Sequence, residues 1–516
     1  MNKRNIFSRT RSYLKNHRKK ILFCLLMVFI FYLFVAVYHV VKPLPPGVSL
    51  EGEIYYVNDS DVDFLYDLTY LDEGGRGGRV SDQEIFDQVF SVIDKAEQFI
   101  LIDFFLYNDY QGSKPELYRN LSSALTQLLI EKKKKNPEIK IIVISDPLNV
   151  VYGGDRSWQF EALEDEGISV VITDLGKLRD SNPFYSGFWR LFIQWFGNSA
   201  AGGIFPHPFS AAENGVSMRS WLALFNFKAN HRKLIVADAP DDNGRGMVSM
   251  VMSANPHDGS SAHNNGALFV KGGIWRDIIK SEQAVLDFSG SKIDLWDMLP
   301  KEIQNLEKEK GTGDNLYGGV EVRVLTEGKI RNDLITEIDK TSQEDSIDVA
   351  MFYLSDREIV DSLLKAADRG VSLRVLLDPN KDAFGHEKNG IPNRQVALEL
   401  LGRTGRDIQV RWYDTHGEQF HTKIILIKTR GRTILYVGSA NLTRRNIGDY
   451  NLETDVKVVD SGIGDVSAII EAERYFEKIW GNEDHAYSVS YEKYEDLSFR
   501  KRWQYRFMEW SGLSTF

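Results

Sequence analysis

The sequence has one cysteine, Cys24, among 516 residues. An intramolecular disulfide and a zinc site built on cysteines are therefore excluded. The chain also lacks a Gly-x-x-x-x-Gly-Lys-Ser/Thr phosphate loop, a Gly-x-Ser-x-Gly turn and a His-Glu-x-x-His zinc pair. Apolar residues make up 43% and charged residues 26%, which excludes a disordered or collagenous chain. The length allows about three domains, or two large ones with an anchor.

An excess of positive charge is also missing. Lys and Arg total 63 against 73 Asp and Glu, a net charge of −10. This argues against a protein whose main task is to bind nucleic acid phosphates. The distribution is uneven, because the first twenty residues hold eight Lys/Arg and no acid. The remainder therefore has 55 basic and 73 acidic residues, a net charge of −18.

A long apolar run follows the basic segment. Residues 21–41 carry no charged side chain, and at about 1.5 Å per residue they cross most of a hydrocarbon core about 30 Å thick. A core helix is seldom apolar on every face, and a cleaved signal peptide usually has a shorter apolar region. We predict a basic cytoplasmic segment over 1–20, a single transmembrane helix over 21–41 and a linker over 42–50. The basic flank marks the cytoplasmic side, so the rest of the chain is expected outside the cell membrane.

Six short blocks recur in the same order in two parts of the remaining chain. The pairs are 99–108 with 346–355, 139–149 with 371–381, 167–174 with 407–414, 231–238 with 421–428, 250–255 with 435–441, and 264–270 with 450–456. Each block is an apolar or β-branched run of strand length, and helical patterns such as 82–97 and 357–369 separate them. Both copies share Asp-Pro, His-x-Lys and Ser-Ala-Asn, which hydrophobic patterning alone does not produce. We predict an α/β protein of two similar halves, each a mixed β-sheet flanked by helices.

These patterns set the predicted domain boundaries. The first domain is expected over 51–315, with an insertion over 178–228, and the second over 316–490. The insertion is rich in aromatic residues and has no counterpart in the second half. It is either a helix packed into an enlarged core or a surface that enters the membrane interface.

The C-terminal segment 491–516 forms its own pattern. Phe499, Trp503, Phe507 and Trp510 fall at helical spacing beside several Arg and Lys residues. This predicts a basic amphipathic helix, which either binds anionic lipid headgroups or docks on the domain.

The two His-x-Lys blocks suggest a phosphate site. His231 and Lys233 are two residues apart on a predicted strand, as are His421 and Lys423, so each pair points to one face. If the halves pack about a pseudo-twofold axis, two imidazoles and two ammonium groups converge. The lysines would repel a metal ion and attract an anion. One histidine could then attack phosphorus while the other protonates the leaving oxygen. Further donors to phosphate are expected from the Ser-Ala-Asn blocks, namely Ser253, Asn255, Ser439 and Asn441.

The pattern His-x-Lys-x-x-x-x-Asp, complete in His231, Lys233 and Asp238, resembles the signature of the phospholipase D superfamily. The resemblance covers nearly all of residues 50–485. It implies a pseudo-twofold pair of phospholipase D-like domains that exchange phosphodiesters through a phosphohistidine, with no metal or organic cofactor. The anchor followed by two such halves looks most like bacterial membrane-bound proteins of the cardiolipin synthase type.

The resemblance also assigns roles to residues. It implies catalytic roles for His231, Lys233, Asp238, His421, Lys423 and Glu453. The second copy departs from the signature, because Lys428 takes the place of the Asp, so that site is expected to be altered. Glu453 is expected to hold the Nδ1 proton of His421, and alignment places Ala267 at the equivalent first-half position. Asp238 could organise the motif rather than touch substrate, and which histidine attacks stays open.

Four functions follow from these observations. The leading one is a phosphatidyltransferase that acts on membrane phospholipids, and the nearest alternative is a phospholipase D that hydrolyses them to phosphatidic acid. A nuclease and an inactive phosphate-binding pseudoenzyme are further alternatives, although the acidic outer part counts against nucleic acid as a partner. We expect a monomer whose two halves form an internal pseudo-dimer.

Overall fold

The computed structural model describes most of the chain, and the structural statements below refer to that part. It comprises residues 3–72, 78–112, 118–210, 215–241, 244–309, 319–383, 386–402, 405, 407–460, 462, 466–514 and 516.

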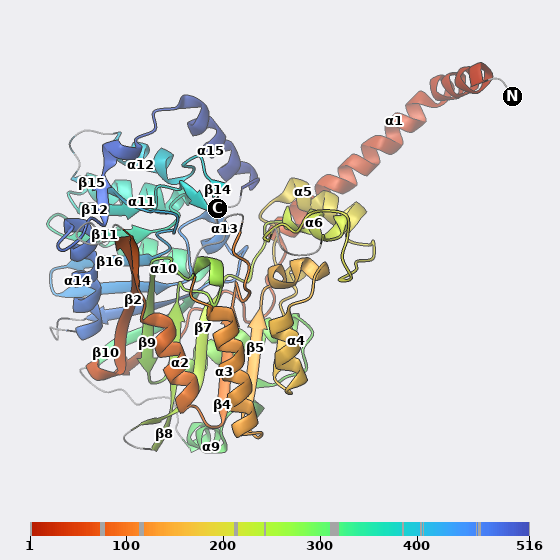
Figure 1. The fold of residues 1–516 in the computed structure, drawn as a ribbon. Helices are drawn as coiled ribbons and strands as arrows, with labels where there is room; N and C mark the ends of the chain where they lie inside the picture. Colours follow the sequence, from red (N-terminus) through yellow and green to blue (C-terminus); the bar gives the residue numbers. More distant parts are fainter. Residues whose placement is uncertain are drawn as a thin grey trace.

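The first half contains an eight-stranded mixed sheet in the order β3-β2-β9-β8-β7-β4-β5-β6 (Figure 1). Its strands are β2 (Val62–Leu71), β3 (Arg79–Asp82), β4 (Phe99–Phe104), β5 (Lys140–Ser145), β6 (Ser169–Ile172), β7 (Lys233–Asp241), β8 (Gly244–Met252) and β9 (Asn265–Lys271). Strands β4, β5 and β6 are parallel, and the other neighbours are antiparallel. The parallel strands are crossover-connected through helices, as the alternation of apolar runs and helical patterns predicts.

The second half contains a nine-stranded sheet in the order β1-β10-β18-β17-β16-β11-β12-β15-β19. Its strands are β1 (Tyr55–Val57), β10 (Val320–Thr326), β11 (Ser346–Met351), β12 (Ser372–Leu377), β15 (Ile408–Tyr413), β16 (Lys423–Thr429), β17 (Arg432–Gly438), β18 (Thr454–Asp460) and β19 (Ser488–Ser490). A separate hairpin joins β13 (Asp382–Ala383) to β14 (His386–Glu387).

The two sheets repeat one topology. Reading inward from β2 and from β10, the orders β2-β9-β8-β7-β4-β5-β6 and β10-β18-β17-β16-β11-β12-β15 match strand for strand. The six recurring sequence blocks supply six of these seven strand pairs. The prediction of two similar α/β halves is therefore confirmed. Strand β1 precedes the first half in sequence but pairs with β10 of the second, with Tyr55 opposite Val322.

Helices cover the outer face of each sheet and also lie between the sheets. The first half has α2 (Ile85–Lys95), α3 (Leu121–Lys135) and α4 (Trp158–Asp165) outside, followed by α7 (Trp275–Phe288), α8 (Leu295–Met298) and α9 (Lys301–Glu309). The second half has α10 (Gly328–Asp339), α11 (Arg357–Asp368), α12 (Asn393–Leu401), α13 (Arg444–Ile447), α14 (Ser467–Gly481) and α15 (Phe499–Ser511). The helices predicted over 82–97 and 357–369 are α2 and α11.

The apolar core joins the two halves. Its central cluster combines Leu234 and Leu268 of the first sheet with Ile424 and Leu435 of the second, together with side chains of α7 and α14. Two outer clusters lie under the remaining helices, one in each half. Because both sheets bury a face against the same central cluster, the ends of their strands are held in fixed positions relative to each other.

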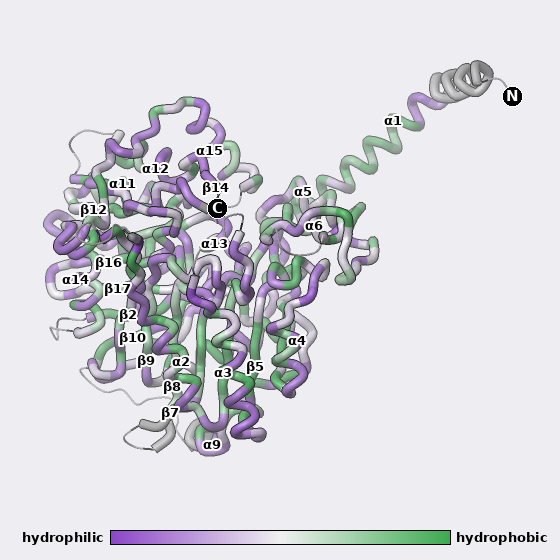
Figure 2. Tube along the Cα trace, in the orientation of Figure 1, coloured by the Kyte–Doolittle hydropathy of each residue, from purple (hydrophilic) through white to green (hydrophobic). Residues whose placement is uncertain are grey.

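Helix α1 (Lys3–Val41) projects away from both sheets (Figure 1). Its part from His17 to Val41 is long and apolar enough to cross a membrane, with a mean hydropathy of 2.9 and almost no buried side chains. Figure 2 shows this apolar stretch between the basic start of the helix and the folded part. Near its end α1 contacts α5 (Pro183–Phe188), which continues into the π-helical turn η4 (Trp189–Ile193); α6 (Met218–Leu224) follows in the same insertion.

Candidate active site

Each His-x-Lys pair lies where an inner strand begins. Lys233 opens β7 and Lys423 opens β16, with the histidine two residues earlier. The shared Asp-Pro blocks hold the chain just before each histidine, because Asp146 Oδ2 accepts the Asn230 N–H at 2.7 Å and Asp378 Oδ2 accepts the Phe420 N–H at 2.8 Å. These two buried carboxylates therefore set the position at which each histidine leaves its sheet.

Backbone contacts across the halves bring the two histidines to a common region. The His231 N–H donates to Leu452 O at 2.9 Å, and the Asn264 N–H donates to Gln419 O at 3.1 Å. Each histidine segment thus lies against the start of the last inner strand of the other half. Both histidines are buried, each only 8% exposed.

Glu453 partners His231 and not His421. Its carboxylate lies 2.9 Å from His231 Nδ1 through Oε1 and 3.1 Å through Oε2. The prediction that Glu453 holds the ring of its own half is therefore wrong, because the start of β18 lies against the chain before β7 of the opposite half. Ser439 Oγ and Asn446 Nδ2 also donate to the Glu453 carboxylate. Burial raises the pKa of Glu453 to about 7, and Lys233 opposes that rise.

Asn265 is the corresponding partner of His421. Its Oδ1 lies 3.2 Å from His421 Nδ1. The amide is oriented by its other end, since Asn265 Nδ2 donates to His263 O at 3.0 Å. The predicted alignment of Ala267 with Glu453 is wrong by two residues. The Ser253 N–H donates to Gly266 O, and the equivalent Ser439 N–H donates to Thr454 O, so Gly266 corresponds to Thr454. The preceding residues, Asn265 and Glu453, are therefore equivalent.

The serines of the Ser-Ala-Asn blocks hold these partners and do not point to a phosphate. Ser253 Oγ donates to Asn265 Oδ1 at 3.0 Å and accepts the Gly266 N–H, and Ser439 Oγ makes the same pair of bonds with Glu453 and the Thr454 N–H. Their hydroxyl donors are occupied in this arrangement, so it gives no support to the expectation that they donate to phosphate, which stays a prediction.

The two asparagines of these blocks differ from each other. Asn255 Oδ1 accepts the Leu106 N–H at 3.0 Å and so braces the chain after β4. Asn441 is 4% exposed, and in the described part of the chain its Oδ1 has no hydrogen-bond partner. Because Oδ1 is an acceptor, this atom cannot donate to a phosphate, and a donor role for Asn441 stays a prediction.

The two lysines occupy equivalent positions. Lys233 Nζ donates to His231 O and Lys423 Nζ to His421 O, each at 2.6 Å. Burial lowers the pKa of Lys233 to about 7, and burial together with the facing Lys233 lowers the pKa of Lys423 well below its ordinary value. A bound anion would reverse both shifts, because it favours the charged ammonium.

The charges of each half act on the histidine of the other. Burial is the main cause that lowers the pKa of both rings, and Lys423 adds to it at His231 as Lys233 does at His421. Both imidazoles are therefore neutral near pH 7 in the free protein. A neutral ring whose Nδ1 proton is held by a partner leaves Nε2 available as a nucleophile or base.

Two aromatic residues that sequence reasoning missed complete the symmetry. Phe105 lies 4.8 Å from the His231 ring and 5.1 Å from Lys233 Nζ, while Phe352 lies 5.0 Å from the His421 ring and 5.3 Å from Lys423 Nζ, all measured to ring centroids. The two phenylalanines occupy the same place in the first recurring block, so comparison of the repeats could have found them.

Asp238 and Lys428 lie away from the histidines. Asp238 Oδ1 accepts the N–H groups of Glu97, Gln98 and Phe99 at 3.1, 2.9 and 2.8 Å, so it fixes the loop before β4. It lies five residues along β7 from Lys233, which favours the alternative that it organises the motif; a catalytic role stays a prediction. Lys428 forms ion pairs with Asp348 and Glu473 and is partly exposed, so its charge is compensated five residues along β16 from Lys423.

A buried ion network supports only the His231 side. Arg232 is fully buried and donates to Glu282 at 2.8 Å and to Glu327 at 2.6 Å. Glu327 Oε1 also accepts the Glu453 N–H at 3.1 Å. In the second half the equivalent contact is between two hydroxyls, Thr422 and Tyr475, at 3.0 Å. The two halves share a fold but surround their histidines with different charge.

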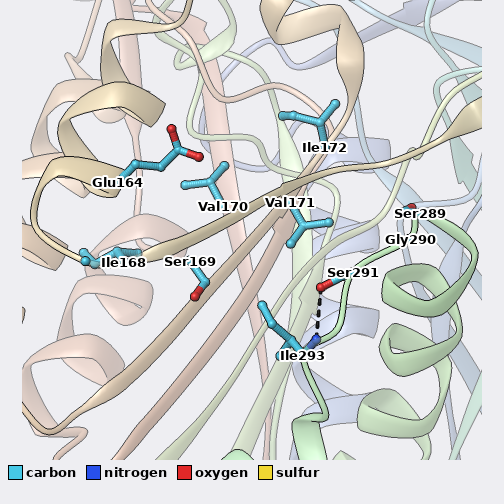
Figure 3. A pocket seen from close by; sticks show the side chains of 11 residues that line it. Glu164, Ile168, Ser169, Val170, Val171, Ile172, Ser289, Gly290, Ser291 and Ile293 are labelled. Atoms are coloured by element: carbon cyan, nitrogen blue, oxygen red, sulfur yellow. Dashed lines mark hydrogen bonds between the residues drawn. The ribbon is translucent and has the colours of Figure 1, made fainter.

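A groove of about 620 Å³ lies at the free edge of the first sheet, between β6 and the chain that follows α7 (Figure 3). Residues 168–172, 289–291 and 293 line it together with Glu164 and Gly167. It contains none of the motif residues, and we assign it no part in the reaction.

Known proteins resemble this chain in sequence over part of its second half and in fold over most of its length. Residues 334–480 match the family model described as cardiolipin synthase, PLD-like domain, a stretch that includes His421 and Glu453. The fold resembles phosphatidylserine synthase from Haemophilus influenzae Rd KW20, with a TM-score of 0.53 at 10% identity over 90% of this chain and 96% of that one. Two shorter structures also match: NucT from Helicobacter pylori (TM-score 0.26, 18% identity, 33% of this chain, 99% of that chain) and Nuc, a phospholipase D family member from Salmonella typhimurium (0.25, 18%, 31% and 95%). The curated proteins contain no match to the sequence.

Proposed function

Because the chain belongs to the phospholipase D superfamily of enzymes, we propose that it is a membrane-anchored phosphatidyltransferase of the cardiolipin synthase type. The observation that carries this proposal is the pair of buried histidines from opposite halves, each with its Nδ1 held across the interface. Two such rings and two lysines whose charges act on one another suit a phosphodiester, which needs an attacking group, a proton donor and charge compensation.

In the first step His231 Nε2 attacks the phosphorus of a phospholipid. The bound phosphodiester anion favours the charged form of His421, which takes up a proton on Nε2. A bond then forms between His231 Nε2 and phosphorus, the bond from phosphorus to the headgroup oxygen breaks, and His421 gives its Nε2 proton to that oxygen. The released alcohol leaves, and a phosphatidyl group remains on His231. Lys233 and Lys423 compensate the charge on the non-bridging phosphate oxygens.

The assignment of His231 as nucleophile rests on the difference between the two partners. A phosphorylated imidazole that keeps its Nδ1 proton is cationic, and the Glu453 carboxylate compensates this charge. Asn265 offers His421 only a neutral amide oxygen. His421 can therefore exchange a proton with substrate oxygens without being fixed in its charged form.

In the second step an alcohol resolves the intermediate. His421 takes the proton of the acceptor hydroxyl, the hydroxyl oxygen attacks phosphorus, and the bond from phosphorus to His231 Nε2 breaks. With a second lipid alcohol as acceptor the product is a phosphodiester and the reaction is a transfer. With water as acceptor it is phosphatidic acid and the reaction is hydrolysis.

The anchor supports a lipid substrate. We place α1 across the cell membrane with the basic segment 1–20 in the cytoplasm and the two sheets outside, in accordance with the positive-inside rule. A single chain would suffice for activity, since both halves contribute to one site.

The test uses the full chain in detergent with phosphatidylglycerol, alone and with added glycerol or a second phospholipid, followed by mass spectrometry of the lipids. We expect cardiolipin to form, and His231→Ala and His421→Ala to abolish it. Phosphatidic acid as the sole product would replace the transferase by a phospholipase D. Folded protein that turns over no phospholipid would contradict both, and activity on a nucleic acid would then favour a nuclease.

A further inference from the structure

The insertion exposes an unusual number of large apolar side chains. On and after α5, Phe184, Phe188, Phe192, Trp195 and Phe196 are exposed, with Trp195 at 75%. Their backbone is nevertheless well fixed, because Tyr185 Oη donates to Leu222 O at 2.6 Å and Asn182 Nδ2 donates to Phe225 O at 2.9 Å. The insertion is therefore a folded unit with an apolar outer face, and not a helix buried in an enlarged core.

The C-terminal helix continues this face. On α15, Phe499, Trp503, Phe507 and Trp510 are 52–72% exposed, while Tyr505 and Glu509 face the second half. The rings of Phe184 and Trp510 lie 6.4 Å apart, so the two surfaces meet although they are far apart in sequence. Trp and Tyr side chains are typical of membrane interfaces. We call these nine exposed residues of the insertion and α15 the apolar collar.

Contacts with α1 fix the depth of the insertion. Gly187 lies against Ala36 and Tyr32, since an added Cβ at Gly187 would be 3.1 Å from Ala36 Cβ and 3.3 Å from Tyr32 Cε2. Tyr32 Oη also donates to Phe184 O. From Lys20 to Tyr32 the helix rises about 18 Å at about 1.5 Å per residue, well short of a hydrocarbon core about 30 Å thick. If α1 spans the bilayer, Tyr32 and Ala36 lie in its outer half, and so does α5.

We propose that the apolar collar is immersed in the outer leaflet, so that the enzyme rests in the membrane around its own anchor. The occupant of this surface is the phospholipid bilayer itself. Lys42, whose Nζ donates to Gly176 O, and the Asp180–Arg190 ion pair then lie near the headgroups. This inference rests on α1 spanning the membrane, as proposed above, and not on which reaction the enzyme catalyses.

The same elements lie beside the candidate active site. Phe227 lies at the end of the insertion, and its ring centroid is 5.2 Å from Cζ of the Arg445 guanidinium. Arg445 Nη2 also donates a hydrogen bond to Ser514 Oγ, in the segment after α15, at 3.3 Å. The charge of Arg445 contributes to the low pKa of His231. The elements that carry the collar therefore contact Arg445, whose charge acts on His231, and immersion would bring phospholipid headgroups close to this side of the site.

The direct test is fluorescence quenching in proteoliposomes. Cys24 is the single cysteine, so Cys24→Ser allows one label at a time at Trp195→Cys on the insertion, Trp503→Cys on α15, or Trp296→Cys on α8. Trp296 is the control, an exposed tryptophan on α8 shortly before α9 in the chain. Figure 1 shows α9 at the end of the molecule away from α5. Each labelled full-length chain is reconstituted into phosphatidylethanolamine and phosphatidylglycerol vesicles that contain nitroxide lipids.

We expect several-fold stronger quenching at 195 and 503 than at 296, with 195 favouring nitroxides deeper in the acyl chains. Equal quenching at all three positions would overturn the proposal. So would protection at 195 and 503 that depends on protein density in the vesicles, because it would mean that a second copy of the chain covers the collar. Neither readout requires turnover, so the result does not depend on the proposed reaction.

A second measurement ties the collar to turnover. Trp195→Asp combined with Trp503→Asp should reduce turnover of vesicle phospholipid about tenfold or more, because two side chains that leave an apolar environment lose at least the 1.4 kcal/mol that this factor requires. Turnover of a small soluble phosphodiester should stay within about twofold of the parent. Trp296→Asp is the control. Unchanged lipid turnover in the double variant, or an equal loss on both substrates, would overturn the proposal.

Discussion

Glu453→Gln isolates the carboxylate that supports His231. The side chain is fully buried, lies 2.9 Å from Nδ1 and also accepts hydrogen bonds from Ser439 and Asn446. Glutamine keeps the size but removes the charge and can turn an N–H toward Nδ1. That would favour the tautomer with its proton on Nε2, which cannot attack phosphorus.

The magnitude follows from the two losses together. Replacement of a buried carboxylate by its amide in a comparable arrangement costs about 10⁴-fold in kcat, mainly through the wrong tautomer. We therefore expect kcat to fall about 10³- to 10⁴-fold, or about 4 to 5.5 kcal/mol in transition-state stabilisation. The matched control is Asn265→Ala beside His421. It removes the hydrogen bonds to His421, Ser253 and His263. The one to the neutral His421 ring bears directly on kcat and contributes about 1 to 1.5 kcal/mol, so a loss of about tenfold is expected.

The assay is initial-rate transfer on phosphatidylglycerol in mixed micelles, with circular dichroism to verify the fold. Equal losses in Glu453→Gln and Asn265→Ala would refute the argument that the two histidines have different roles. A larger loss in Asn265→Ala would exchange those roles.

Three further outcomes are expected. Burial raises the pKa of Glu453 in the folded state to about 7 from 4.5. The protonated carboxyl therefore stabilises the fold at low pH, and this stabilisation is lost as the pH rises from about 4.5 to 7. The melting temperature of Glu453→Gln should lack this loss, and the wild-type rate should rise through pH 7 as the carboxylate forms. Asp238→Ala removes three backbone hydrogen bonds and should lower the free energy of unfolding by about 2 to 4 kcal/mol in denaturant titrations, with kcat little changed. Lys428→Asp breaks ion pairs with the buried Asp348 and with Glu473 and places a like charge beside both. It should lower the free energy of unfolding by more than the contribution of an exposed pair, about 1 kcal/mol, without altering kcat; a large change in rate would contradict its placement away from the site.

The sequence predicts the repeated architecture because strand runs and polar blocks recur in order. The same alignment contains the site phenylalanines Phe105 and Phe352, whose identity in both copies is a usable signal. It fails at β9 and β18, where it pairs Ala267 with Glu453 although Asn265 is the true equivalent. A shift of two residues keeps the inward and outward alternation of a strand, so hydrophobic patterning cannot detect it.

A single sequence does not indicate which side chains contact each other across the interface between the two halves. Glu453 follows His421 along the chain, but it contacts His231 because the two sheets meet at the ends of their inner strands. The serine hydroxyls are likewise committed to Asn265 and Glu453 by the geometry of the strand starts. Arg232 carries no sequence signal as a buried ion-pair residue, since it stands between two site residues in an ordinary strand pattern.

The central claim is that His231 forms the covalent bond to phosphorus while His421 transfers protons. The most direct test mixes the enzyme with phosphatidylglycerol and stops the reaction rapidly without acid or heat. The protein is then digested, and the peptides that contain each histidine are analysed by mass spectrometry. We predict a phosphatidyl adduct on the His231 peptide, absent from His231→Ala. An adduct on the His421 peptide, or turnover with no adduct on either histidine, would contradict the account.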